Sequence, residues 1–162
     1  MTTLLSRAEI AQAAVDRFNL KPFAWGERDC AQLAKFALMR AGHPNPLKGG
    51  RSYRGELGAV RALAFAVQAF GLPKNSDLAA VLDAMGLPRI APAQALPGDI
   101  VGLHGPAPFG VALSIAVGNN KALGFAPDPE ADGLPRCYVG EMLVEVDGVV
   151  AAATAWRVNP CR

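Results

Sequence analysis

The chain is poor in charge and contains no long apolar run. Charged residues make up 19% of its 162 residues and the formal net charge is +2, so the chain has no large positive field to attract a polyanion. Nucleic acid is therefore not an expected partner. The richest apolar stretch, 59–70, is interrupted by Arg61 and Gln68 and falls short of the roughly 18 to 20 apolar residues that a membrane span needs. The sequence predicts no membrane span.

Cysteine and histidine are also scarce. The chain has three cysteines, Cys30, Cys137 and Cys161, with no C-x-x-C pair, and only two histidines. This set predicts no self-contained metal site and no cofactor. Because the N-terminus lacks the basic start, apolar block and cleavage site of a signal peptide, we expect synthesis in a reducing cytoplasm and free thiols rather than a Cys137–Cys161 disulfide. A metal held by these two cysteines together with another chain stays open.

The composition, 51% apolar, suits one continuous core, and we expect a single domain over 1–162. Apolar residues at helical spacing, bounded by capping residues or by glycine and proline, predict four helices. They are expected at 6–18, 30–41, 54 or 55 to 70, and 77–85. Ser6 and Glu9 form an expected capping box for the first helix, and Asp29 is the expected N-cap of the second.

The character of the sequence changes at Leu96, after which short branched segments alternate with glycine or proline and predict strands. They are expected at 99–104, 110–117, 121–126, 137–146 and 151–158. Helices followed by strands predict an α+β domain, with the N-terminal helices packed on a C-terminal antiparallel sheet. The proline- and glycine-rich stretch 43–53 is expected to be a surface loop, and Gly118-Asn119-Asn120 a hairpin turn.

Cys30 opens the predicted second helix, and two interpretations of it fit the sequence. A thiol in the first turn of a helix faces unpaired backbone N–H groups and the positive end of the helix dipole, which favour a thiolate and so a nucleophile. Alternatively, Cys30 heads the apolar stripe that continues with Leu33, Ala34 and Ala37 and is a small buried hydrophobe. Spacing alone favours the second interpretation.

Four short segments carry a resemblance to a known family. They are Trp25-Gly-x-x-Asp29-Cys30, 96–101 (Leu-Pro-Gly-Asp-Ile-Val), 115–120 (Ile-Ala-Val-Gly-Asn-Asn) and 155–158 (Ala-Trp-Arg-Val). The first three are similar to the nucleophile segment and to two strand segments of the NlpC-type cell-wall cysteine peptidases. All four together resemble an uncharacterised, phage-encoded branch of that papain-like superfamily. The resemblance implies a papain-like (NlpC-type) domain and a place in a phage virion.

Such a peptidase needs a histidine and a third polar residue beside its cysteine, and this chain has other residues at the corresponding positions. The resemblance places the catalytic histidine of the family at Ala112 and its third polar residue near Gly124, and neither residue can act as a base or orient one. His104 lies in the same predicted hairpin as Ala112 and is the one candidate substitute, although a histidine at a strand end is more often an exposed loop residue. His43 is set aside because the helical rise places it about 18 Å from Cys30.

Trp25 and Asp29 are the candidate binding residues beside Cys30. Trp25 is either a core aromatic or one wall of a cleft next to the thiol. Asp99 is expected to cap a turn where a strand begins.

Two functions of different classes follow from these observations. The first is a non-catalytic structural or docking component of a phage tail, near the tail tip, with other tail proteins as partners. The second is a cysteine peptidase or amidase that binds peptidoglycan and cleaves its stem peptides as the phage enters its host. In that case Cys30 is the nucleophile and His104 the base. The missing histidine at 112 favours the first function.

Overall fold

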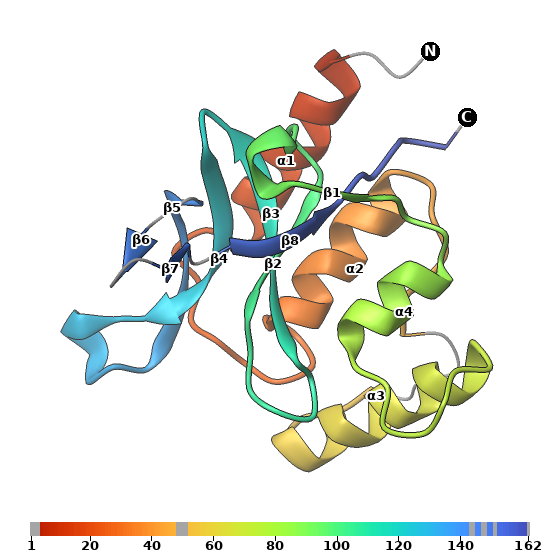
Figure 1. Cartoon of the computed structure of the whole chain (residues 1–162). Coiled ribbons are helices and arrows are strands. Elements are labelled where there is room, and N and C mark those ends of the chain that lie inside the picture. The colour runs from red at the N-terminus through yellow and green to blue at the C-terminus, as the bar shows by residue number, and fades with distance from the viewer. Residues whose placement is uncertain (1–3, 48–51, 143–144, 147–148, 151, 162) are drawn as a thin grey trace.

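The computed structural model describes residues 4–47, 52–142, 145–146, 149–150 and 152–161. Within these residues, four helices lie beside an antiparallel sheet, which confirms the α+β class (Figure 1). The helices are α1 (Leu4–Phe18), α2 (Cys30–Arg40), α3 (Glu56–Ala69) and α4 (Leu78–Ala84). The strands are β1 (Arg89–Ile90), β2 (Ile100–His104), β3 (Val111–Gly118), β4 (Lys121–Pro127), β5 (Pro135–Glu141), β6 (Glu145–Val146), β7 (Val149–Val150) and β8 (Ala152–Trp156), and two short 3-10 turns are η1 (Pro92–Gln94) and η2 (Pro129–Ala131).

The helices begin close to their predicted capping residues. The Asp29 carboxylate accepts the backbone N–H of Gln32 at 2.8 Å and so caps α2 as predicted, and Asp77 caps α4 in the same way. The predicted start of the first helix was wrong: α1 begins at Leu4, so Ser6 lies inside its first turn rather than at its cap. None of the described helices combines the length and the apolar composition that crossing a membrane requires.

Six strands form one antiparallel sheet in the order β1-β8-β2-β3-β4-β5. Strand β8, from the end of the chain, lies beside β2, and β3 is paired with β2 and β4 through two hairpins. Asn119 and Asn120 make the turn between β3 and β4 with φ values of 52° and 58°. A two-residue hairpin turn requires this left-handed conformation, and asparagine tolerates it. The predicted turn is confirmed.

The helices cover one face of the sheet, and this arrangement determines which strand residues lie near α2. Leu113 and Ile115 of β3 belong to the main core, together with buried residues from all four helices. The alternate residues of β3 face the other side of the sheet, where Ala116 joins a smaller cluster with Val101. Only every second residue of each strand can therefore approach Cys30.

One strand prediction needs correction, and one short strand was not predicted. The strand expected at 137–146 is β5, which runs from Pro135 to Glu141 and is followed by a separate hairpin of β6 and β7; residues 143–144 lie outside the described chain. Strand β5 can begin with proline because it is the outer strand of the sheet and Pro135 is its first residue. Strand β1 was not expected, because two residues carry no periodic signal.

The stretch 43–53 was expected to be a surface loop, but part of it is buried. Leu47 and Tyr53 form a small core cluster with Ala59 and Ala62 of α3. Residues 48–51 lie outside the described chain. Proline and glycine correctly indicated a break in regular structure, but they do not determine whether the apolar side chains among them are exposed.

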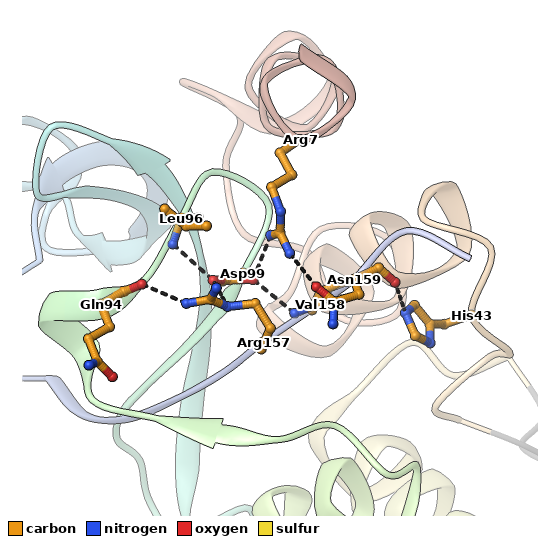
Figure 2. Close-up of polar contacts among 8 residues, drawn as sticks. All are labelled: Arg7, His43, Gln94, Leu96, Asp99, Arg157, Val158 and Asn159. Carbon is orange, nitrogen blue, oxygen red and sulfur yellow. Dashed lines mark hydrogen bonds and ion pairs between the residues drawn. The ribbon is translucent and has the colours of Figure 1, made fainter. Parts of the chain in front are cut away.

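Asp99 connects α1, the start of β2 and the C-terminal segment (Figure 2). Its fully buried carboxylate accepts hydrogen bonds from Arg7 Nη1 at 2.9 Å, Leu96 N–H at 2.9 Å and Val158 N–H at 2.8 Å, and Arg157 Nε lies 3.0 Å away. The bond to Leu96 confirms the expected turn cap. The two arginines were not expected, and they compensate the charge that burial would otherwise make costly.

His43 belongs to the same connection. Its Nε2 lies 2.6 Å from the backbone oxygen of Asn159, and the side-chain oxygen of Asn159 accepts a hydrogen bond from Arg7 Nη2 at 2.7 Å (Figure 2). The segment after α2 is thereby held to the C-terminal segment. His43 has a structural role at the opposite end of α2 from Cys30.

Candidate functional site: the Cys30 cleft

A tight loop places Asp29 and Cys30 at the start of α2. Ala24 and Arg28 pair their backbones through two hydrogen bonds of 2.9 and 2.8 Å, and Gly26 forms the turn with a φ of 79°. The N–H of Gly26 donates to Asp29 Oδ2 at 2.8 Å, while Asp29 Oδ1 caps the helix. One buried carboxylate therefore holds both the loop before it and the first helical turn after it.

Tyr53 completes this arrangement from the segment before α3. Its hydroxyl donates to Asp29 Oδ2 at 2.7 Å, and its backbone oxygen lies so close to Gly26 that a Cβ at that position would overlap with it. Only glycine fits at 26, because both the positive φ and this contact exclude a side chain. Burial and the neighbouring Asp29 carboxylate raise the pKa of Tyr53, so its hydroxyl stays protonated and remains a donor.

The Cys30 cleft is a hollow of about 360 Å³ bounded by the start of α2, by α3 and by strands β3 and β4. Aromatic rings line one side: Phe23 stands edge-on to Trp25 and Phe125, with ring centroids 4.9 and 5.6 Å apart, and Trp25 lies 6.2 Å from Phe109. Ala59, Ala62 and Leu63 of α3 line another side, together with the first residue of that helix, Glu56. Trp25 is therefore a wall of a cleft beside Cys30, the second of its two predicted roles.

The Cys30 thiol is half-buried in this cleft, and its surroundings favour the protonated form. Burial raises the pKa of Cys30. Hydrogen bonds from the backbone of Leu113, Ala31 and Cys30 itself act in the opposite direction, whereas the adjacent Asp29 carboxylate adds to the rise. Of the two interpretations of Cys30, these surroundings favour the buried small hydrophobe, because desolvation outweighs the hydrogen bonds at the helix start.

The strand side chains that face α2 near Cys30 are apolar. Val111 and Leu113 of β3, and Leu123 and Phe125 of β4, belong to the same core against which Cys30 packs. A thiol nucleophile needs a base within hydrogen-bond reach, or about 4 Å in a free enzyme. None of these four side chains can accept a proton.

His104 is exposed at the end of β2 and does not line the cleft. It pairs with Val111, and its neighbour Leu103 pairs with Ala112, so His104 and Ala112 share one hairpin as predicted. Ala112 borders the cleft, but Leu103 packs in the smaller cluster on the other face of the sheet. Strand alternation therefore directs the Ala112 side chain away from α2 and the Val111 side chain towards it.

The structure brings together three of the four site residues predicted from the sequence. Asp29, Cys30 and Trp25 line one cleft, whereas His104 lies outside it. Sequence reasoning missed Tyr53 and Phe109, which lie in segments without a periodic pattern. The signal that could have revealed them is an aromatic residue among glycine and proline, since a large ring is rarely left in water without a partner.

The remaining cysteines provide a test of the Cys30 thiol. We expect iodoacetamide at pH 7 to label Cys30 more slowly than the exposed Cys161, because burial raises the pKa of Cys30 and so lowers its thiolate fraction. Timed labelling followed by mass spectrometry measures both in one sample. Cys137, which is buried with its pKa raised to about 12, is the internal control for a blocked thiol. Faster labelling of Cys30 than of Cys161 would show an activated thiolate.

The fold and site define an α+β domain in which a cysteine opens a helix inside an apolar cleft. The sequence matches the family model described as a domain of unknown function (DUF6950) over residues 6–158, and the chain belongs to that family. The match includes every element that borders the cleft. No curated protein and no solved structure matches the chain.

Proposed function

We propose that the chain is a non-catalytic papain-like (NlpC-type) domain that serves as a structural or docking component of a phage tail, near the tail tip. The observation that carries the non-catalytic part is the apolar surrounding of Cys30, where Val111 and Leu113 occupy the strand positions that face the thiol. The papain-like part is supported by a cysteine-headed helix packed on an antiparallel sheet. The tail location rests on the resemblance of the four sequence segments to a phage-encoded branch.

The chemistry of a cysteine peptidase explains why this surrounding favours a non-catalytic role. Such an enzyme forms an acyl-enzyme by attack of a thiolate, and a neighbouring base must take the thiol proton. Here burial raises the pKa of Cys30, and the cleft lining among the described residues contains no histidine. Cys30 is thus better suited to packing than to attack.

The same cleft suits docking. Its largely aromatic and apolar lining, with a volume of about 360 Å³, has room for an apolar side chain of a neighbouring tail protein. Burial of one leucine- or phenylalanine-sized side chain contributes about 1.5 to 3 kcal/mol. The loop that carries Trp25 is fixed by the hydrogen bonds of Asp29, so the cleft is already formed in the free protein. Binding therefore causes little loss of conformational entropy.

Particles of the phage that encodes the chain provide the test. We expect mass spectrometry to detect the protein in purified virions, and cryo-EM to place it near the tail tip with a neighbouring chain against the Cys30 cleft. Detection of the tail-tube protein in the same sample is the control for intact tails. Intact virions without this protein would contradict the tail assignment, and a tail in which the cleft faces solvent would contradict the docking role.

The alternative is a cysteine peptidase or amidase that acts on peptidoglycan stem peptides, with Cys30 as nucleophile and His104 as base. One observation favours it: Ile100, on the same strand as His104 and at even spacing from it, belongs to the helix-side core, so alternation places His104 on the face that carries Cys30. His104 is nevertheless outside the cleft, and substrate binding would have to bring it to the thiol.

A further inference from the structure

A basic groove lies along α1 and α2, on a surface separate from the Cys30 cleft. It consists of two adjoining hollows of about 370 and 490 Å³, which share Arg17, Phe18, Glu27 and Gln32 among their lining residues. Helices α1 and α2 pack together beside it (Figure 1). The basic residues of the groove are Arg17, Lys21, Arg28, Lys35 and Arg40, and its acidic residue is Glu27.

The charge of the groove is only partly compensated within the described chain. Five basic residues face one acidic residue, whereas the whole chain has a net charge of only +2, so positive charge is concentrated on this surface. Arg28 is paired with Glu27 at 3.4 Å. Among the described residues, none of the other four basic side chains makes an ion pair. A concave surface with one sign of charge attracts ligands of the opposite sign.

Two of these cations are held in place by aromatic rings. The Arg17 guanidinium lies 5.4 Å from the centroid of the Phe36 ring and 5.7 Å from that of Phe18, and the Arg40 guanidinium lies 6.0 Å from Phe36. A guanidinium stacked on a ring keeps its N–H edge free, and that edge matches the two oxygens of a carboxylate. Met39, half of whose surface is exposed, adds an apolar contact to the groove.

We propose that the basic groove docks an acidic segment of a partner protein, in which Asp or Glu residues alternate with apolar ones. The carboxylates would pair with the arginines and lysines, and the apolar side chains would contact Met39. Single-stranded nucleic acid fits less well, because it needs aromatic faces that are free to stack on bases and guanidinium groups lie over Phe36. The proposal does not depend on what occupies the Cys30 cleft.

Fluorescence anisotropy with a labelled synthetic peptide that alternates Glu and Leu tests this assignment. Lys21→Glu combined with Lys35→Glu reverses two charges of the groove. Arg61→Glu combined with Lys74→Glu is the matched control, because it changes the net charge equally at two exposed positions outside the groove. We expect the groove variant to weaken peptide binding at least about tenfold, since two attractive contacts become repulsive, and the control variant to weaken it less than about threefold. Circular dichroism checks that both variants are folded.

Three results would overturn the proposal. Equal weakening by the two variant pairs would show general charge attraction rather than a groove. Tighter binding of an oligothymidylate of the same charge would identify nucleic acid as the better ligand. Failure of the wild-type chain to bind the peptide at low ionic strength, where exposed charges act most strongly, would show that the groove does not accept an acidic segment.

Discussion

Asp99→Asn is expected to lower the free energy of unfolding by about 3 to 5 kcal/mol, the range for breaking a buried ion pair. The Asp99 carboxylate is fully buried and contacts two arginines, one from α1 and one from the C-terminal segment. Asparagine keeps the shape but removes the charge, so Arg7, which is itself buried, loses its anionic partner. Urea unfolding followed by tryptophan fluorescence measures the loss.

Glu27→Gln is the matched control for Asp99→Asn. It also neutralises one carboxylate of an ion pair, but the Glu27 side chain is 72% exposed and lies 3.4 Å from Arg28. Exposed pairs contribute little, and we expect a change of less than about 0.5 kcal/mol. A loss below about 1 kcal/mol for Asp99→Asn would contradict the view that this buried cluster holds the ends of the described chain to the sheet.

Gly26→Ala is expected to lower the free energy of unfolding by about 2 to 5 kcal/mol. A positive φ costs a non-glycine residue about 1 to 2 kcal/mol, and an overlap in a packed interior costs about 1 to 3 kcal/mol more. Both apply at Gly26, whose φ is 79° and whose Cβ would overlap with the backbone oxygen of Tyr53. The substitution would therefore force apart the loop of Trp25 and the segment that carries Tyr53.

Gly86→Ala separates these two costs. Gly86, which follows α4, has the same φ of 79°, but within the described part of the chain no atom beyond its two chain neighbours lies within 4 Å of an added Cβ. We expect a loss of only about 1 to 2 kcal/mol there, from the backbone conformation alone. The difference between the two variants in urea unfolding measures the contact of Gly26 with Tyr53. Equal losses would mean that Tyr53 does not constrain the loop.

The features that the sequence predicted are those determined by neighbouring residues. Asp29 can accept the backbone N–H of the residue three positions later, and this is enough to start α2. Two consecutive asparagines are enough to form the turn between β3 and β4. The partners of Asp99 are 92 and 59 residues away in the chain. A single sequence contains no periodic signal for such contacts. The turn cap at Asp99 could therefore be predicted, whereas its ion pairs with two arginines could not.

Cys30 shows how a local signal can be reversed by tertiary packing. The helix start alone favours a thiolate, but the pKa of the thiol depends on how much water reaches it. That is decided by α3, the loop that carries Trp25 and β3, all of which border the cleft around Cys30. The position of the site could therefore be predicted from the sequence, whereas the protonation state of its thiol could not.

Digestion of purified muropeptides tests the central claim most directly. The wild-type chain, Cys30→Ala and His104→Ala would each be incubated with the same substrates at neutral pH, beside an active cysteine peptidase of the NlpC type that shows the substrates to be cleavable. We expect the wild type and both variants to release no product, because the Cys30 thiol is protonated and faces apolar side chains. Products released by the wild type and lost in Cys30→Ala would contradict the non-catalytic assignment.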